Sequence, residues 1–242
     1  FHFHKRITDG IFHAYGNNSF CVFNSILNNI LYLIYKFEVN SIVLYDLINN
    51  EQLTIIKKAH KNGINSLKHY QDIKNKTDLL LTYSSLDYDL KIWNINNISN
   101  ILTIKIEPKN DNKFLHDCCL LNDNGQLFAL VSQTKEPIKL FDLKGNKIKE
   151  IKNSCSDEGG ISYINIYFDE KSKKKYILIG GYSYSISYDY SEDKEYKKYL
   201  GHLDDGNFYE LIINYRNNKE YLIGINDNGK IMIWNFHSGD LI

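Results

Sequence analysis

A histidine, a serine and an aspartate precede a tryptophan in one segment of the chain, and side chains of these types can take part in catalysis or in buried hydrogen bonds. His60 is followed by Ser85, Asp87 and then Trp93, and a second histidine, His202, precedes another tryptophan further on. A histidine beside an aspartate can act as a general base. Since no nucleophile motif accompanies them, we favour a structural role. Buried imidazole and indole groups need hydrogen-bond partners, and these residues can supply them.

Three other groups of residues are weaker candidates for binding. His2 and His4 alternate along one expected strand and could ligate a metal, but no third ligand is evident. The acidic pair at 157–158 supplies fewer oxygen ligands than a calcium site needs. The basic run 171–175 could touch RNA or an acidic partner, but a solvated loop is favoured. We therefore expect no metal and no cofactor.

Composition excludes several classes of function. The 242 residues include 29 Lys+Arg and 29 Asp+Glu, so bulk positive charge does not gather nucleic acid, which is not an expected partner. No apolar run reaches the roughly 18 residues that span a bilayer, so no membrane association is expected. The 4 cysteines follow no pairing pattern, which is typical of a reducing compartment. We expect an intracellular protein of the cytoplasm or nucleus.

The elements that must position these residues follow an internal repeat. A β-branched or aromatic run ends five times in an aromatic residue followed by Asp or Asn, with the aromatic residues at 45, 93, 141, 188 and 234. Two apolar strands are expected before each such run, and a more polar strand after most of them. Four short strands in each repeat of 46 to 48 residues describe one blade of a β-propeller. The predicted fold is all-β, with antiparallel four-stranded blades at 11–57, 58–105, 106–152, 153–200 and 201–242.

At these residues the chain resembles the WD-repeat (WD40) propeller family, whose repeat carries a Gly-His and a downstream Trp-Asp. The second repeat fits best, with His60 standing 33 residues before Trp93. The resemblance implies a hydrogen-bonded structural tetrad of His60, Ser85, Asp87 and Trp93. In the fifth repeat it implies a partial tetrad, in which asparagines replace serine and aspartate, made of His202, Asn226, Asn228 and Trp234.

The resemblance also carries expectations about the extent of the domain. Propellers of this family commonly have about seven blades, within the range of four to eight known for propellers. We therefore expect residues 1–242 to form one propeller domain that is a fragment of a larger, seven-bladed one. Residues 1–10 are expected to be the outer strand of a preceding blade. A genuine five-bladed ring is the alternative.

The function implied by the resemblance is that of a non-catalytic scaffold. Proteins, in a multiprotein complex, are the expected partners, bound through rim and top-face loops, which vary freely on a rigid frame. The candidate partner-binding residues are Lys58, Lys61, Asn62, Asp157, Glu158, Asp204 and Asp205. One alternative is an RNA-associated propeller in an RNA-processing or ribosome-assembly complex, which a contiguous basic patch would favour. The weaker alternative is an enzyme on a propeller scaffold, which needs convergent titratable groups.

Overall fold

A computed structural model describes residues 20–106, 115–133, 135–157, 160–200, 208–216, 219–226 and 229–242 of the chain. The chain divides into two compact units, 1–103 and 104–242, and each is described by itself. Both consist of antiparallel sheets whose strands follow one another in chain order. The prediction of an all-β propeller fold is confirmed, whereas the single domain and the larger seven-bladed propeller stay predictions.

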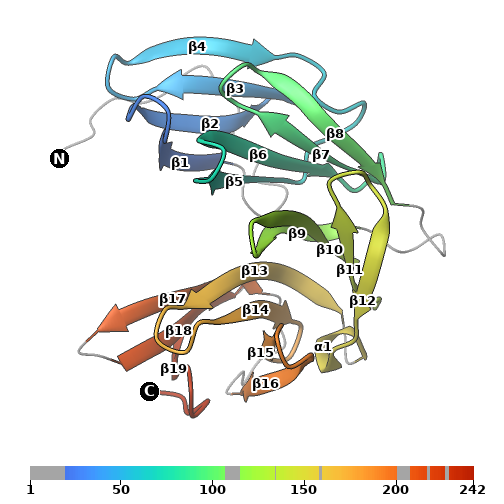
Figure 1. Ribbon diagram of the computed structural model, residues 1–242, viewed down its shortest axis with the longest axis vertical. Coiled ribbons are helices and arrows are strands. Elements are labelled where there is room, and N and C mark those ends of the chain that lie inside the picture. Colours follow the sequence, from blue (N-terminus) through green and yellow to red (C-terminus); the bar gives the residue numbers. More distant parts are fainter. Residues whose placement is uncertain are drawn as a thin grey trace. The chain divides into compact units, whose positions relative to one another are not determined.

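The first unit holds two four-stranded sheets (Figure 1). The first sheet consists of β1 (Phe20–Asn24), β2 (Leu31–Phe37), β3 (Ser41–Asp46) and β4 (Glu51–Ile56). The second consists of β5 (Ser66–Asp72), β6 (Thr77–Ser84), β7 (Asp89–Asn94) and β8 (Ser99–Lys105), and β8 crosses the boundary between the units.

The second unit holds three sheets. The third sheet of the chain consists of β9 (Leu115–Asp123), β10 (Gln126–Gln133), β11 (Ile138–Asp142) and β12 (Lys147–Ile151). The fourth consists of β13 (Ile161–Asp169), β14 (Lys174–Gly181), β15 (Ser185–Asp189) and β16 (Lys194–Tyr199). The fifth has three strands in the described residues: β17 (Phe208–Arg216), β18 (Lys219–Asn226) and β19 (Ile231–Asn235). An isolated bridge joins Leu241 to Trp234 beside β19.

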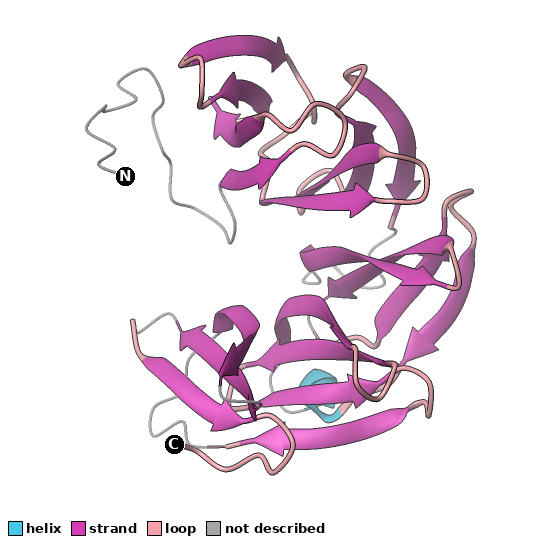
Figure 2. Ribbon diagram, turned by 60° about the vertical axis from the view of Figure 1, so that its left-hand side comes forward, coloured by secondary structure: helices cyan, strands magenta, loops and turns pink. Residues whose placement is uncertain are grey.

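Helix is almost absent from the described residues. A single turn, α1 (Ser154–Asp157), precedes the fourth sheet (Figure 2). Within the part of the chain that the structure describes, no helix has the length and apolar character needed to cross a membrane.

The repeated Asp or Asn after each aromatic residue has a direct structural reason. It ends the third strand of its sheet, and its side-chain oxygen accepts backbone N–H groups of the turn that follows. Asp46 Oδ1 accepts the N–H groups of Ile48 and Asn49 at 2.8 and 2.9 Å. The same side-chain role recurs at Asn94, Asp142, Asp189 and Asn235. Asp and Asn are suited to it because their short side chains reach the backbone two residues ahead.

Apolar cores lie between neighbouring sheets of each unit. In the first unit, side chains of the first two sheets share one cluster that includes Ile34, Ile42, Leu80 and Trp93. In the second unit, one cluster joins the third and fourth sheets and another joins the fourth and fifth. Because the inner strands are covered on both faces, their sequences are nearly continuous apolar runs. The stacking of neighbouring sheets therefore supplies the burial that a lone sheet lacks.

Candidate functional site

His60 lies at the centre of a buried hydrogen-bond network in the first unit. It belongs to the loop between β4 and β5, and its side chain is 0% exposed. Its Nδ1 lies 2.7 Å from Asp89 Oδ1, and its Nε2 lies 2.7 Å from Thr82 Oγ1. The indole N–H of Trp93 donates to the same Thr82 oxygen at 2.9 Å. The four side chains thus form one continuous chain of hydrogen bonds.

The donor is defined at each end of this chain of hydrogen bonds. An indole N–H can only donate, so Thr82 Oγ1 accepts from Trp93 and has its own proton left to give. At the other end, His60 Nδ1 carries a hydrogen that it donates to the Asp89 carboxylate, and Nε2 shares the remaining hydrogen bond with the Thr82 hydroxyl.

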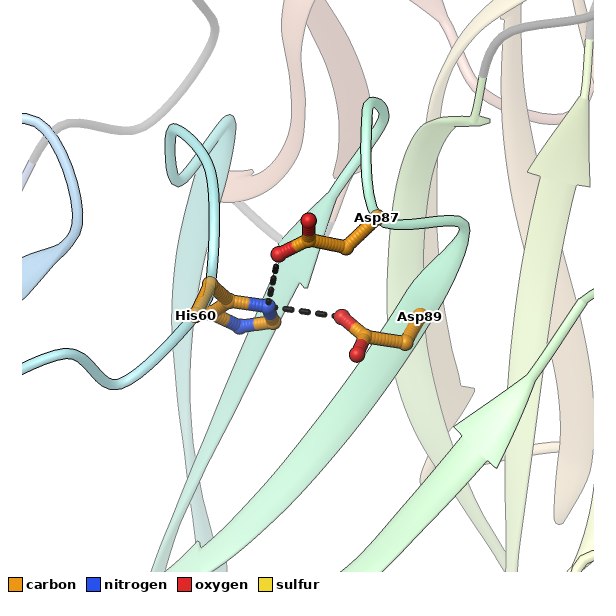
Figure 3. A group of neighbouring side chains, drawn as sticks. All are labelled: His60, Asp87 and Asp89. Carbon is orange, nitrogen blue, oxygen red and sulfur yellow. Dashed lines mark hydrogen bonds and ion pairs between the residues drawn. The ribbon is translucent and has the colours of Figure 1, made fainter.

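Asp87 approaches the same imidazole but bonds elsewhere. Its Oδ2 lies 3.8 Å from His60 Nδ1 (Figure 3). The carboxylate accepts the backbone N–H groups of Lys61 and Asn62 at 2.8 and 3.0 Å, and the Asn62 side-chain amide at 2.6 Å. Burial acts to raise the pKa of Asp87, but these hydrogen bonds, chiefly those from Asn62, outweigh it and the pKa is lowered. Asp87 therefore stays ionised and holds the loop that carries His60.

The predicted tetrad needs two corrections. Thr82, not Ser85, bridges His60 and Trp93, and Asp89, not Asp87, makes the short contact with the imidazole. Ser85 follows the end of β6, and its backbone N–H donates to Asn65 Oδ1 at 2.7 Å. The sheet register gives the reason. Leu80 pairs with Trp93, so Thr82, two residues further, lies on the same face as the indole, whereas residue 85 has the opposite parity.

A cation is chemically conceivable at this cluster, because one ligand atom from each of His60, Asp87 and Asp89 lies within 4.8 Å of the others. Their hydrogen bonds do not suit a metal site. His60 Nδ1 donates a proton to Asp89, and Asp87 already accepts N–H groups of the loop. A cation would have to break these bonds, so the geometry describes a packing element.

In the fifth sheet, the tryptophan satisfies its N–H in another way. Trp234 is 0% exposed, and its indole N–H donates to the backbone carbonyl of Leu200 at 2.6 Å. Asn226, predicted in the partial tetrad, instead accepts the Lys230 N–H at 2.9 Å and closes the β18–β19 turn. The other two predicted members, His202 and Asn228, lie outside the described residues.

The predicted partner-binding residues fall into two groups. Lys58 and Lys61 are exposed on the β4–β5 loop, and Asn62 is half-buried against Asp87. Asp157 is the last residue of α1. The other three, Glu158, Asp204 and Asp205, lie outside the described residues.

Sequential antiparallel sheets, each following the chain without crossovers, define a β-propeller. Among solved structures, the chain is similar to that of U3-55K, with a TM-score of 0.67 at 11% sequence identity. The match covers 95% of this chain and 64% of the U3-55K chain, so this chain spans less than two thirds of that protein's length. No protein-family model and no curated protein matches the sequence. At this identity the likeness shows the fold alone.

Proposed function

We propose that the chain is a WD-repeat propeller that serves as a non-catalytic scaffold and binds other proteins, as part of a multiprotein complex, through its loops. The observation that carries the proposal is the β4–β5 loop, 57–65, which is held by hydrogen bonds from both sheets of the first unit and yet presents exposed lysines. The His60–Thr82–Trp93 chain is a poor candidate for catalysis, because His60 and Thr82 are both 0% exposed.

Both sheets of the first unit hold this loop. From the first sheet, the carbonyls of Val39 and Asn40 accept its N–H groups at 3.1 and 3.4 Å. From the second, Lys91 Nζ donates to the Ala59 carbonyl at 2.6 Å, and Asp87 accepts the N–H groups of residues 61 and 62. A loop ordered before binding loses little conformational entropy when a partner docks. Its exposed Lys58 and Lys61 suit acidic side chains of that partner.

The charge distribution favours protein over RNA as the partner. The basic run 171–175, the best candidate for an RNA contact, is partly neutralised. Lys174 Nζ lies 2.8 Å from Asp189 Oδ2, and Lys175 Nζ lies 2.6 Å from Asp123 Oδ1. A lysine that is paired with a carboxylate releases fewer counterions on contact with phosphate and adds less affinity for nucleic acid.

The test compares two double variants of the full chain. Lys58→Ala with Lys61→Ala removes two charges from the β4–β5 loop. Lys74→Ala with Lys76→Ala removes two charges from the exposed β5–β6 turn. This control matches the first pair because each pair replaces one lysine with a left-handed backbone, with φ of 51° at Lys58 and 50° at Lys76. Each protein is used for affinity purification with quantitative mass spectrometry, and its melting temperature is measured.

We expect the first pair to lose co-purified proteins about ten-fold at an unchanged melting temperature, and the second pair to keep them. Equal recovery with both pairs would show that the β4–β5 loop does not bind the partner. Loss of the same proteins from the wild type after ribonuclease treatment would overturn a direct protein contact in favour of RNA.

A further inference from the structure

A pocket of about 250 Å³ opens in the first unit, where the first and second sheets meet. Its walls come from the β1–β2 turn, from β2, β3 and β4, and from the β7–β8 turn. In antiparallel sheets these turns lie at the strand ends opposite to the β4–β5 loop. The pocket is therefore separate from the surface proposed above for partner binding.

Half of the residues that line the pocket are aliphatic, the other half are polar, and none carries a charge. Leu27 and Leu53 stand at its edge, with exposed fractions of 60% and 42%, and the half-buried Ile98 lies on the β7–β8 turn. None of the lining residues is Lys, Arg, His, Asp or Glu. A charged group entering the pocket would lose hydration and find no counter-charge, so the pocket favours an uncharged group. The aliphatic side chains at its edge favour apolar contact with that group.

The hydroxyl group of Tyr32 in the pocket is available to a ligand. Tyr32 is 8% exposed, and its phenol oxygen accepts the side-chain N–H of Asn28 at 2.7 Å. Among the residues that the structure describes, none accepts the hydroxyl proton of Tyr32. A phenol O–H in a largely buried position usually has a partner. A carbonyl oxygen of a bound ligand would supply it.

The pocket walls are held in place before any ligand arrives. Asp78 Oδ2 accepts the hydroxyl of Ser25 at 2.7 Å and the N–H of Ile26 at 3.1 Å, which fixes the β1–β2 turn against the second sheet. The backbone N–H of Asp78 donates to Asn96 Oδ1 at 3.1 Å, which fixes the β7–β8 turn. Binding therefore requires little ordering of the walls.

The size of the pocket points to one side chain of a larger partner. Pockets for free small molecules usually measure about 300–1,000 Å³ and bury most of the ligand. This one is smaller, and its exposed leucines would touch whatever surrounds the bound group. At about 30 Å³ for each water-sized group, it holds roughly eight such groups, enough for Leu, Met or Phe. Buried apolar anchors of this size are typical of interface hot spots.

We propose that this pocket binds one uncharged aliphatic or aromatic side chain of a partner polypeptide, while the Tyr32 hydroxyl donates to a carbonyl oxygen of the same polypeptide. The side chain displaces water from Leu27, Leu53 and Ile98, and the hydrogen bond sets its orientation. Neither contact involves the lysines of the β4–β5 loop.

The test uses the full chain with isotope-labelled Ile and Leu methyl groups. N-acetyl-leucine methylamide and N-acetyl-phenylalanine methylamide are titrated and followed by methyl NMR, with the matching glutamate and lysine amides as charged controls. We expect saturable shifts at the methyl groups of Leu27, Leu53 and Ile98 with the two apolar amides only. The absence of saturable shifts, or equal shifts with the charged amides, would overturn the proposal.

Two variants test the named contacts. Leu53→Glu places a charge at the pocket edge and should weaken binding more than ten-fold. Its control is Leu86→Glu in the β6–β7 turn, which is 60% exposed and does not line the pocket. Tyr32→Phe should weaken binding about five-fold, the effect of one lost hydrogen bond. Equal binding by Leu53→Glu and Leu86→Glu would place the site elsewhere, and unchanged binding by Tyr32→Phe would remove the phenol from it.

A display experiment distinguishes a polypeptide from a small molecule as the ligand. A random heptapeptide library is selected on the wild type and counter-selected on Leu53→Glu. We expect enriched peptides to share one Leu, Met or Phe in an uncharged context and to bind Lys58→Ala with Lys61→Ala equally well. Failure to enrich any peptide, while the amides still bind, would show that the natural ligand is not a polypeptide. Failure of the lysine test leaves this outcome unaffected.

Discussion

At two junctions between neighbouring sheets, different groups bind a buried tryptophan N–H and a buried acidic side chain. The first junction lies between the first and second sheets, and the last lies between the fourth and fifth. In the first, the Trp93 N–H bonds to Thr82 and begins a chain through His60 to Asp89. In the last, the Trp234 N–H bonds directly to the carbonyl of Leu200. A buried indole needs one acceptor, and the repeat leaves open whether side chains or backbone supply it.

An acidic residue occupies the same position at both junctions. Asp78 and Glu220 are the second residues of β6 and β18, and their carbonyls accept the equivalent N–H groups of Ile95 and Phe236, both at 2.9 Å. Within the described residues, Glu220 Oε2 accepts no hydrogen bond, although it lies 3.1 Å from His237 Nε2. At the first junction the acidic side chain therefore reaches the neighbouring sheet through directional hydrogen bonds. At the last junction Glu220 lies near His237 of its own sheet, and its Oε1 lies 3.7 Å from Lys171 Nζ of the fourth sheet.

The largest expected effect comes from breaking the chain at the first junction. His60→Ala removes the hydrogen-bond partner of both Asp89 and Thr82, which are buried, so we expect the free energy of unfolding to fall by about 3 kcal/mol. Urea titration followed by tryptophan fluorescence measures it. His237→Ala at the last junction is the control and should cost less than about 1 kcal/mol, because that side chain is 48% exposed. Equal costs would show that the two junctions do not differ in this way.

The sequence predicted the fold better than the hydrogen bonds within it. The aromatic residue followed by Asp or Asn, five times at near-constant spacing, predicted the propeller, and these residues do close the turn after each third strand. Counting back from Trp93 predicts Ser85 and Asp87 as members of the tetrad. Strand parity would have selected Thr82, because it shares a face with the indole. The pairing of Trp234 with a backbone carbonyl has no sequence signal, since every residue has a carbonyl.

A smaller effect should separate the two acidic residues. Asp78→Asn weakens the acceptor for Ser25 Oγ and for the N–H of Ile26. We expect the free energy of unfolding to fall by about 2 kcal/mol. Glu220→Gln keeps the shape of the side chain and removes a buried carboxylate whose Oε2 accepts no hydrogen bond from the described residues. We therefore expect the free energy of unfolding to change by less than about 1 kcal/mol.

The free energy of unfolding of both variants is measured by urea titration at pH 7.5. The comparison is between the two decreases relative to the wild type. If Glu220→Gln lowers the free energy of unfolding as much as Asp78→Asn or more, the Glu220 carboxylate stabilises the last junction as firmly as the hydrogen bonds of Asp78 stabilise the first.

The smallest effect concerns the pH dependence of the first junction. His69 stacks on Phe23 with ring centroids 3.6 Å apart, and its Nε2 lies 2.9 Å from Asp78 Oδ1. Burial lowers the pKa of His69 from its ordinary 6.5, and the Asp78 carboxylate offsets this only in part. The unfolded chain then binds more protons, so this contribution to stability is complete above pH 6.5 and is lost as the pH falls below it.

His69→Gln keeps a donor for Asp78 and does not titrate. We therefore expect the wild type to lose up to about 1 kcal/mol relative to His69→Gln between pH 7.5 and 5.5, measured by urea titration. A buried histidine elsewhere, His116, titrates in both proteins and cancels in the difference. A difference that stays constant, or grows in favour of the wild type as the pH falls, would mean that Asp78 stabilises the charged imidazole more than burial opposes it.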